Sequence, residues 1–110
     1  MIKKHMLIKM SGVRKKDALL YSKVLENRIE RVLEELEMNI VGRSTYQFQP
    51  YGATVLFLLS ESHCSAHTFW EEGEVYIDLF CCRDFDIEKA VKFFCDALDP
   101  TDVHFEMVDR

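Results

Sequence analysis

The chain has 110 residues, of which 48% are hydrophobic and 30% are charged, and its formal net charge is -5. This length predicts a single domain, and the composition is typical of a folded globular protein rather than a disordered one. The negative charge argues against nucleic acid as the main partner, and no apolar run is long enough to predict a membrane-spanning helix.

The first half of the chain predicts two strands and one long helix. Residues 5–10 form a short apolar run of the kind found in strands. Residues 17–38 predict an amphipathic helix, because apolar side chains recur there at three- and four-residue spacing. That apolar stripe consists of Leu25, Ile29, Val32, Leu33 and Leu36. Residues 40–48 predict a second strand, and the Pro-Tyr-Gly sequence at 50–52 predicts the turn that follows it.

The second half predicts four more strands and a second main helix. Residues 53–59 are strongly apolar and indicate a buried central strand, and residues 64–69 and 75–80 indicate two further strands. Residues 87–98 predict a helix that begins after an N-capping aspartate, and residues 103–108 alternate like a final strand. This order predicts an α+β fold, a two-layer sandwich in which two main helices cover one face of a largely antiparallel sheet.

Residues 60–71 carry an unusual density of chemically active groups. Two acids, two imidazoles, one thiol and four hydroxyls follow directly on the apolar strand at 53–59, and the next predicted strand ends in Cys81-Cys82. A small core gains little from polar side chains at its strand ends, so a departure of this kind usually serves function.

Several short motifs around this stretch resemble those of the prokaryotic S-adenosylmethionine decarboxylases. Glu61-Ser62-His63 resembles the family's self-cleavage site, and residues 67–71 resemble its His-Thr-Trp-Pro-Glu segment. Residues 78–82 resemble its Asp-Leu-Phe-x-Cys strand end, and Phe48 precedes a Pro-Tyr-Gly turn as the family's upstream aromatic does. The motifs keep the family's order and spacing without a gap, which makes the joint signal far more specific than any one of them.

The resemblance implies that the chain cuts itself between Glu61 and Ser62, and that Ser62 is converted into a pyruvoyl cofactor. His67 matches the family histidine associated with this processing, and it is expected to accept a proton within reach of Ser62. Thr54 stands where the family usually has an assisting serine, and it retains the hydroxyl.

The resemblance also implies the roles of the residues that act on the substrate. The pyruvoyl group would form a Schiff base with the substrate amine and serve as an electron sink while carbon dioxide leaves. Cys82 matches the family's proton donor, and adjacent strand residues face opposite ways, so we expect Cys82 to face the site and Cys81 to be buried. Phe48 matches the aromatic that stacks on adenine, Glu71 the glutamate that binds the ribose, and Cys64 a small apolar contact in the nucleoside pocket.

The expected protein is therefore a pyruvoyl-dependent S-adenosylmethionine decarboxylase, whose product supplies aminopropyl groups for spermidine synthesis. Its mature unit would consist of a β chain, residues 1–61, and an α chain, residues 62–110, and two such units would form a homodimer. No secretory signal is recognisable, so we expect a cytoplasmic protein with reduced thiols and no membrane partner.

A related pyruvoyl enzyme that decarboxylates ornithine or arginine is the first alternative. Phe69-Trp70 replaces the family's Trp-Pro, Arg83-Asp84 replaces the glycine after Cys82, and Lys9 stands where an acid is common. Such changes could adapt the pocket to a small basic amino acid, whereas the retained Phe48 and Glu71 favour the nucleoside substrate.

A small zinc-binding regulatory domain is the alternative from another class. His63, Cys64 and His67, together with Cys81-Cys82, have the ligand types that zinc prefers. Their spacing is poor for zinc, because the adjacent cysteines lack the usual two-residue gap and side chains alternate along strands. The main prediction therefore includes no metal site.

Overall fold

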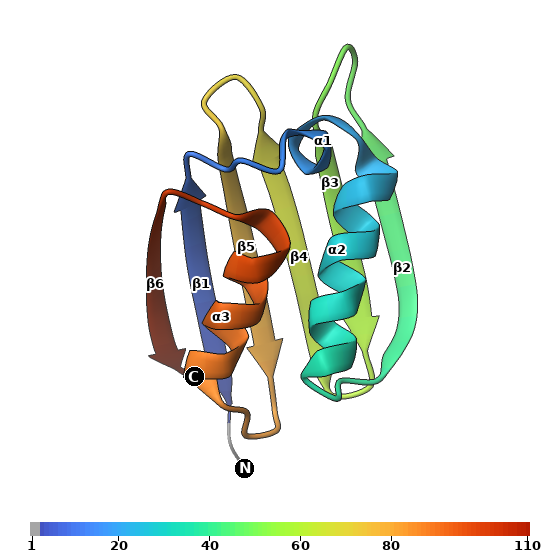
Figure 1. Cartoon of the computed structure of the whole chain (residues 1–110). Coiled ribbons are helices and arrows are strands. Elements are labelled where there is room, and N and C mark those ends of the chain that lie inside the picture. The colour runs from blue at the N-terminus through green and yellow to red at the C-terminus, as the bar shows by residue number, and fades with distance from the viewer. Residues whose placement is uncertain (1–2) are drawn as a thin grey trace.

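The computed structural model describes residues 3–110, which form one six-stranded sheet with helices on a single face (Figure 1). The strands are β1 (Lys4–Ser11), β2 (Ile40–Gln47), β3 (Ala53–Leu59), β4 (Ser62–Phe69), β5 (Glu74–Cys81) and β6 (Asp102–Asp109). The helices are α1 (Lys16–Leu20), α2 (Ser22–Glu35) and α3 (Ile87–Leu98). The strand order is β2-β3-β4-β5-β1-β6, and every neighbouring pair is antiparallel. The predicted α+β two-layer sandwich is confirmed.

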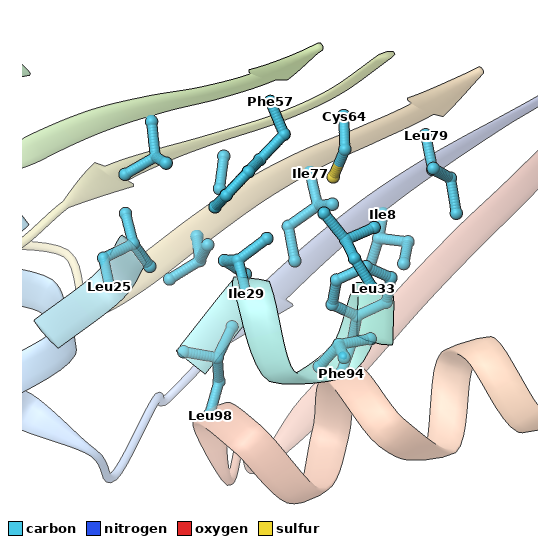
Figure 2. Close-up of a cluster of buried hydrophobic side chains, with 14 of the residues drawn as sticks. Ile8, Leu25, Ile29, Leu33, Phe57, Cys64, Ile77, Leu79, Phe94 and Leu98 are labelled. Atoms are coloured by element: carbon cyan, nitrogen blue, oxygen red, sulfur yellow. The ribbon is translucent and has the colours of Figure 1, made fainter. Parts of the chain in front are cut away.

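The core lies between the sheet and the two longer helices. Figure 2 shows side chains of α2 and α3 converging on the inner face of the central strands. The predicted stripe on α2 is confirmed, since Leu25, Ile29 and Leu33 are almost completely buried. Burying each such side chain contributes about 1.5–3 kcal/mol, so this stripe favours the packing of α2 against the sheet.

The opposite face of the sheet has no helix over it. Side chains alternate between the two faces of a strand, and in β3 Val55 and Phe57 are buried while Leu56 and Leu58 are 50% and 58% exposed. The prediction of a buried strand at 53–59 is therefore right for only one of its two faces. We call the uncovered side the helix-free face.

The single long helix predicted in the first half is wrong, because the chain leaves the helix at Tyr21. Tyr21 is extended (φ -119°, ψ 124°) and separates α1 from α2. The Leu20 carbonyl accepts hydrogen bonds from Gln47 Nε2 (2.8 Å) and from the Gly52 amide (3.0 Å). Gln47 Oε1 in turn accepts from the Ser22 amide at 2.6 Å. These long-range bonds satisfy backbone groups that a continuous helix would have paired internally.

The predicted second helix agrees with α3 in both bounds and cap. Asp86 Oδ1 accepts from the Lys89 amide at 3.1 Å, and Asp99 adopts the left-handed conformation (φ 50°) that commonly ends helices. Across residues 3–110, no helix combines the length and the apolar character needed to cross a membrane.

Candidate active site

The residues predicted to act together lie at opposite ends of β4. β4 runs from the lower end of the sheet to its upper end in Figure 1, and Ser62 is its first residue and His67 its sixth. The strand rise of about 3.3 Å per residue separates their Cα atoms by roughly 17 Å. An odd spacing also directs the two side chains to opposite faces. A single chain therefore does not bring His67 within reach of Ser62.

The predicted site residues therefore fall into two groups. The cleavage cluster comprises Glu61, Ser62, Cys81, Cys82 and Arg83. The histidine cluster comprises Phe48, Thr54, His67, Phe69 and Glu71.

In the cleavage cluster, the Ser62 hydroxyl is buried and not engaged. Ser62 lies opposite Cys81 in the pairing of β4 with β5. Its Oγ is buried and has no hydrogen-bond partner among residues 3–110. A buried polar atom without a partner costs free energy and calls for an explanation. A hydroxyl held beside the Glu61 peptide as a nucleophile provides one.

The carbonyl of Glu61 already faces a hydrogen-bond donor. Its oxygen accepts from the backbone amide of Cys82, at a donor–acceptor distance of 3.4 Å. Addition of a nucleophile to this carbonyl would place negative charge on the oxygen, and an N–H group aimed at it stabilises that charge. Such bonds are often long before the reaction and shorten as charge develops.

The two adjacent thiols differ in their surroundings. Cys81 is 1% exposed on the helix-covered face, and burial raises the pKa of its thiol. Cys82 follows the end of β5 and is half-buried. Cys81, rather than Cys82, stands directly across from Ser62. The role of Cys82 as proton donor stays a prediction, and the structure identifies Cys81 as the thiol to compare with it.

Arg83 connects the cleavage cluster to the end of α2. Its Nε donates to Glu61 Oε2 at 2.9 Å, and its Nη2 donates to the carbonyls of Leu36 (3.0 Å) and Glu37 (3.2 Å). From the sequence, Arg83 was notable only as a departure from the family pattern. No local signal pairs it with a residue 22 positions earlier.

In the histidine cluster, His67 is held by a hydroxyl and by aromatic rings. Thr54 lies opposite His67 in the pairing of β3 with β4, and its Oγ1 is 2.6 Å from His67 Nδ1. The ring centroids of Phe48 and Phe69 lie 5.7 Å and 4.8 Å from that of the imidazole. The structure thus brings Thr54, His67 and Phe48 together, and their roles in processing and in substrate binding stay predictions.

A hollow of about 390 Å³ lies beside this cluster. Phe48, His67, Trp70 and Glu71 are among the residues that line it. Its size falls within the range of small-molecule sites, and aromatic walls with the carboxylates of Glu71 and Glu72 suit a nucleoside. A neighbouring hollow of about 600 Å³ shares Trp70 and Glu71 with it and extends the concave surface.

Gln47 is a supporting residue that the sequence did not reveal. Its Nε2 donates to the carbonyls of Phe48 and Gly52, both at 3.0 Å, in addition to the bond with Leu20. These bonds fix the loop that carries Phe48 against the break between α1 and α2. The sequence showed only that glutamines flank Phe48, which is not by itself a signal for this role.

Cys64 lies in the hydrophobic core, not beside the hollow. Its side chain is 1% exposed on the helix-covered face, and burial raises the pKa of its thiol to about 12. The zinc alternative gains no support either. Within residues 3–110, no group of three or more His, Cys, Asp or Glu side chains could hold a metal ion. His63 and His67 are separated by roughly 13 Å along β4.

Comparison with known proteins gives one consistent result. The sequence model of the S-adenosylmethionine decarboxylase family matches residues 4–110. The chain is 34% identical over 108 residues to the S-adenosylmethionine decarboxylase proenzyme of Archaeoglobus fulgidus, which covers 97% of this chain and 96% of that protein. The proenzyme of Picrophilus torridus is 32% identical over 109 residues, covering 96% of this chain and 82% of the other.

A solved structure agrees with these sequence matches. The crystal structure of the adenosylmethionine decarboxylase from Aquifex aeolicus superimposes with a TM-score of 0.88 at 27% identity, covering 99% of this chain and 90% of that one. The match extends over the whole sheet and its helices, so it includes both clusters. The chain belongs to the S-adenosylmethionine decarboxylase family.

Proposed function

We propose that this protein decarboxylates S-adenosylmethionine with a pyruvoyl group that it makes from its own Ser62. The observation that carries the proposal is the arrangement at the Glu61–Ser62 bond. A buried, unengaged hydroxyl adjoins a carbonyl that already accepts a hydrogen bond from the Cys82 amide. Family membership supports the substrate, and the product would supply aminopropyl groups for spermidine synthesis.

Self-cleavage begins with attack of Ser62 Oγ on the carbonyl carbon of Glu61. The Cys82 amide stabilises the resulting oxyanion, and collapse of the adduct breaks the peptide C–N bond and leaves an ester. Removal of the Ser62 α-proton then expels the Glu61 carboxylate. The remaining dehydroalanine takes up one water molecule and releases ammonia, which leaves a pyruvoyl group at the start of the α chain. His67 is the proposed proton acceptor in these steps.

The residues around Ser62 and the hollow fit the decarboxylation step. The pyruvoyl carbonyl supplies an electron sink for the bond to the departing carbon dioxide. Cys82 donates a proton to the substrate carbon, Phe48 stacks on the adenine, and Glu71 accepts hydrogen bonds from the ribose. All four cysteines are free, which suits the reducing cytoplasm in which we place the enzyme.

A homodimer completes the site, because one chain keeps the two clusters at opposite ends of β4. The helix-free face carries large exposed apolar side chains, namely Tyr46, Leu56, Leu58, Phe69 and Tyr76. Apolar patches of this kind commonly mark association surfaces. A twofold axis between two such faces, perpendicular to the strands, reverses the strand direction. It therefore brings the strand end with the Glu61–Ser62 bond of one sheet to the His67 end of the other. The Ser62 hydroxyl points to the helix-covered face, so the proposal requires that it turn about the start of β4 to meet the partner's histidine.

Intact mass under denaturing, reducing conditions tests the processing. We expect two fragments, residues 1–61 and residues 62–110, and the second should begin with a pyruvoyl group in place of Ser62. Ser62→Ala should remain one chain. Release of carbon dioxide should then be measured with S-adenosylmethionine, ornithine and arginine in parallel. An uncut wild-type chain, or faster release from ornithine or arginine, would contradict the proposal.

A further inference from the structure

Arg83 ties together three segments that meet at the proposed cleavage site. It follows the end of β5, and its guanidinium reaches the Glu61 carboxylate in the turn between β3 and β4. The same group reaches the carbonyls of Leu36 and Glu37, where α2 ends. These contacts join stretches separated by 22 and more residues in the sequence.

The acceptors around Arg83 would repel one another without a cation. The last carbonyls of a helix lack internal partners and carry partial negative charge. Glu37 adopts a left-handed conformation (φ 60°) just after α2, and its carbonyl is one of the two that Arg83 binds. The Glu61 carboxylate adds a full negative charge at the same place. A planar guanidinium with several donors in a fixed geometry can serve all three acceptors at once, which an ammonium group does less well.

Two consecutive residues hold Glu61 from different directions. Arg83 binds its side-chain carboxylate at 2.9 Å, and the Cys82 amide binds its main-chain carbonyl oxygen at 3.4 Å. Glu61, whose carbonyl Ser62 must attack, is therefore held both at its carbonyl oxygen and at its side-chain carboxylate. An attack across one peptide bond depends strongly on such orientation, because a small misplacement of the carbonyl lowers the rate.

We infer that Arg83 is a positioning residue for self-cleavage, holding Glu61 so that its carbonyl faces both the Ser62 hydroxyl and the Cys82 amide. This inference rests on the proposed function and deepens it. Arg83 acts through Glu61 and does not touch the reacting atoms, and a guanidinium at this position departs from the glycine that the family usually has there.

The test follows the cutting of freshly synthesised precursor over time on denaturing gels. Arg83→Met and Glu61→Ala should each slow cleavage roughly tenfold, the scale of a lost charged hydrogen bond. The double variant should be no slower than the slower single variant, because both changes remove the same contact. Arg83→Lys should cleave at an intermediate rate.

Arg28→Met is the matched control. Arg28 also joins a helix-end carbonyl to a carboxylate, since its guanidinium donates to Ala97 O (3.2 Å) and to Asp17 Oδ2 (3.5 Å). It lies far from the scissile bond in the chain, so its loss should lower stability to urea without slowing cleavage. This control separates positioning from a general effect on the fold.

Three results would overturn the inference while leaving the proposed function intact: cleavage of Arg83→Met at the wild-type rate, additive effects in the double variant, or equal slowing by Arg28→Met. If Arg83→Met fails to fold, the cleavage rate of Glu61→Ala serves as the test instead. Cleavage of that variant at the wild-type rate would overturn the inference. A wild-type precursor that is never cleaved between Glu61 and Ser62 would instead contradict the proposed function, and the inference would fail with it.

Discussion

Thr54 Oγ1 lies 2.6 Å from His67 Nδ1, across the pairing of β3 with β4 on the helix-free face. When Nδ1 carries the ring proton, it donates to Thr54 and leaves Nε2 free to accept a proton. The contact therefore orients the imidazole, and it is compatible with the tautomer that a general base requires.

Replacing Thr54 tests this relationship. Thr54→Val keeps the shape of the side chain but removes its oxygen, and we expect it to slow self-cleavage roughly tenfold through the lost hydrogen bond. Thr54→Ser should cleave nearly as the wild type does. The time course of precursor loss on denaturing gels measures both, and equal rates for all three proteins would exclude a role for the hydroxyl.

Mixing two inactive chains tests the shared site. Ser62→Ala and His67→Ala should each remain uncut when expressed alone, because each homodimer lacks one essential group at both sites. A mixed dimer combines Ser62 of one copy with His67 of the other. We therefore expect the His67→Ala chain to be cut in co-expressed samples and the Ser62→Ala chain to remain whole. Mass spectrometry distinguishes the two, and no cutting in verified mixed dimers would contradict the proposed arrangement.

The two neighbouring cysteines allow a matched comparison. The Cys82→Ala variant should still cleave itself, since only the backbone amide of residue 82 takes part in that step. Its turnover should fall by at least about a hundredfold, because the thiol that donates the proton is missing. Cys81→Ala should keep turnover within a few-fold of the wild type. The measurement is the initial rate of carbon dioxide release from processed enzyme. The opposite pattern would assign the donor to Cys81, which lies directly across from Ser62.

The buried thiol of Cys64 predicts a loss of stability in alkali. Burial raises its pKa from 9.0 to about 12, so above pH 9 the folded state retains a proton that the unfolded chain releases. Stability is fully present below pH 9 and falls as the pH rises towards 12, with a loss of about 1.4 kcal/mol from this group at pH 10.

Urea unfolding at pH 8 and pH 10 measures this loss, with Ser62→Ala as the background so that the chain stays whole. Adding Cys64→Val removes the titrating group while it keeps an apolar side chain at the site. The drop between the two pH values should shrink by about 1.4 kcal/mol in that variant. An unchanged drop would mean that other groups account for the alkaline sensitivity.

Local pattern was sufficient for the fold class and for most of its elements. Alternation in the strands, the helical spacing of Leu25, Ile29 and Leu33, and the Asp86 cap depend on residues close together in the chain. The motifs from Glu61 to Cys82 also lie close together in the chain, so the sequence by itself indicated the family and supported the prediction of a cleavage site.

Contacts between distant segments were decided only by the tertiary structure. The chain leaves the helix at Tyr21 because Gln47 and Gly52 donate hydrogen bonds to the Leu20 carbonyl. Arg83 meets Glu61 because β5 ends beside the turn that begins β4. Such partners depend on the order and register of the strands, which no local periodicity encodes.

The same reason explains why residues close in sequence are separated in space. Ser62 and His67 are five positions apart, yet an extended strand places them at opposite ends and on opposite faces. Cys64 lies between them and faces the core. The sequence determined which groups the chain carries. The strand geometry decided which of them one chain can bring together.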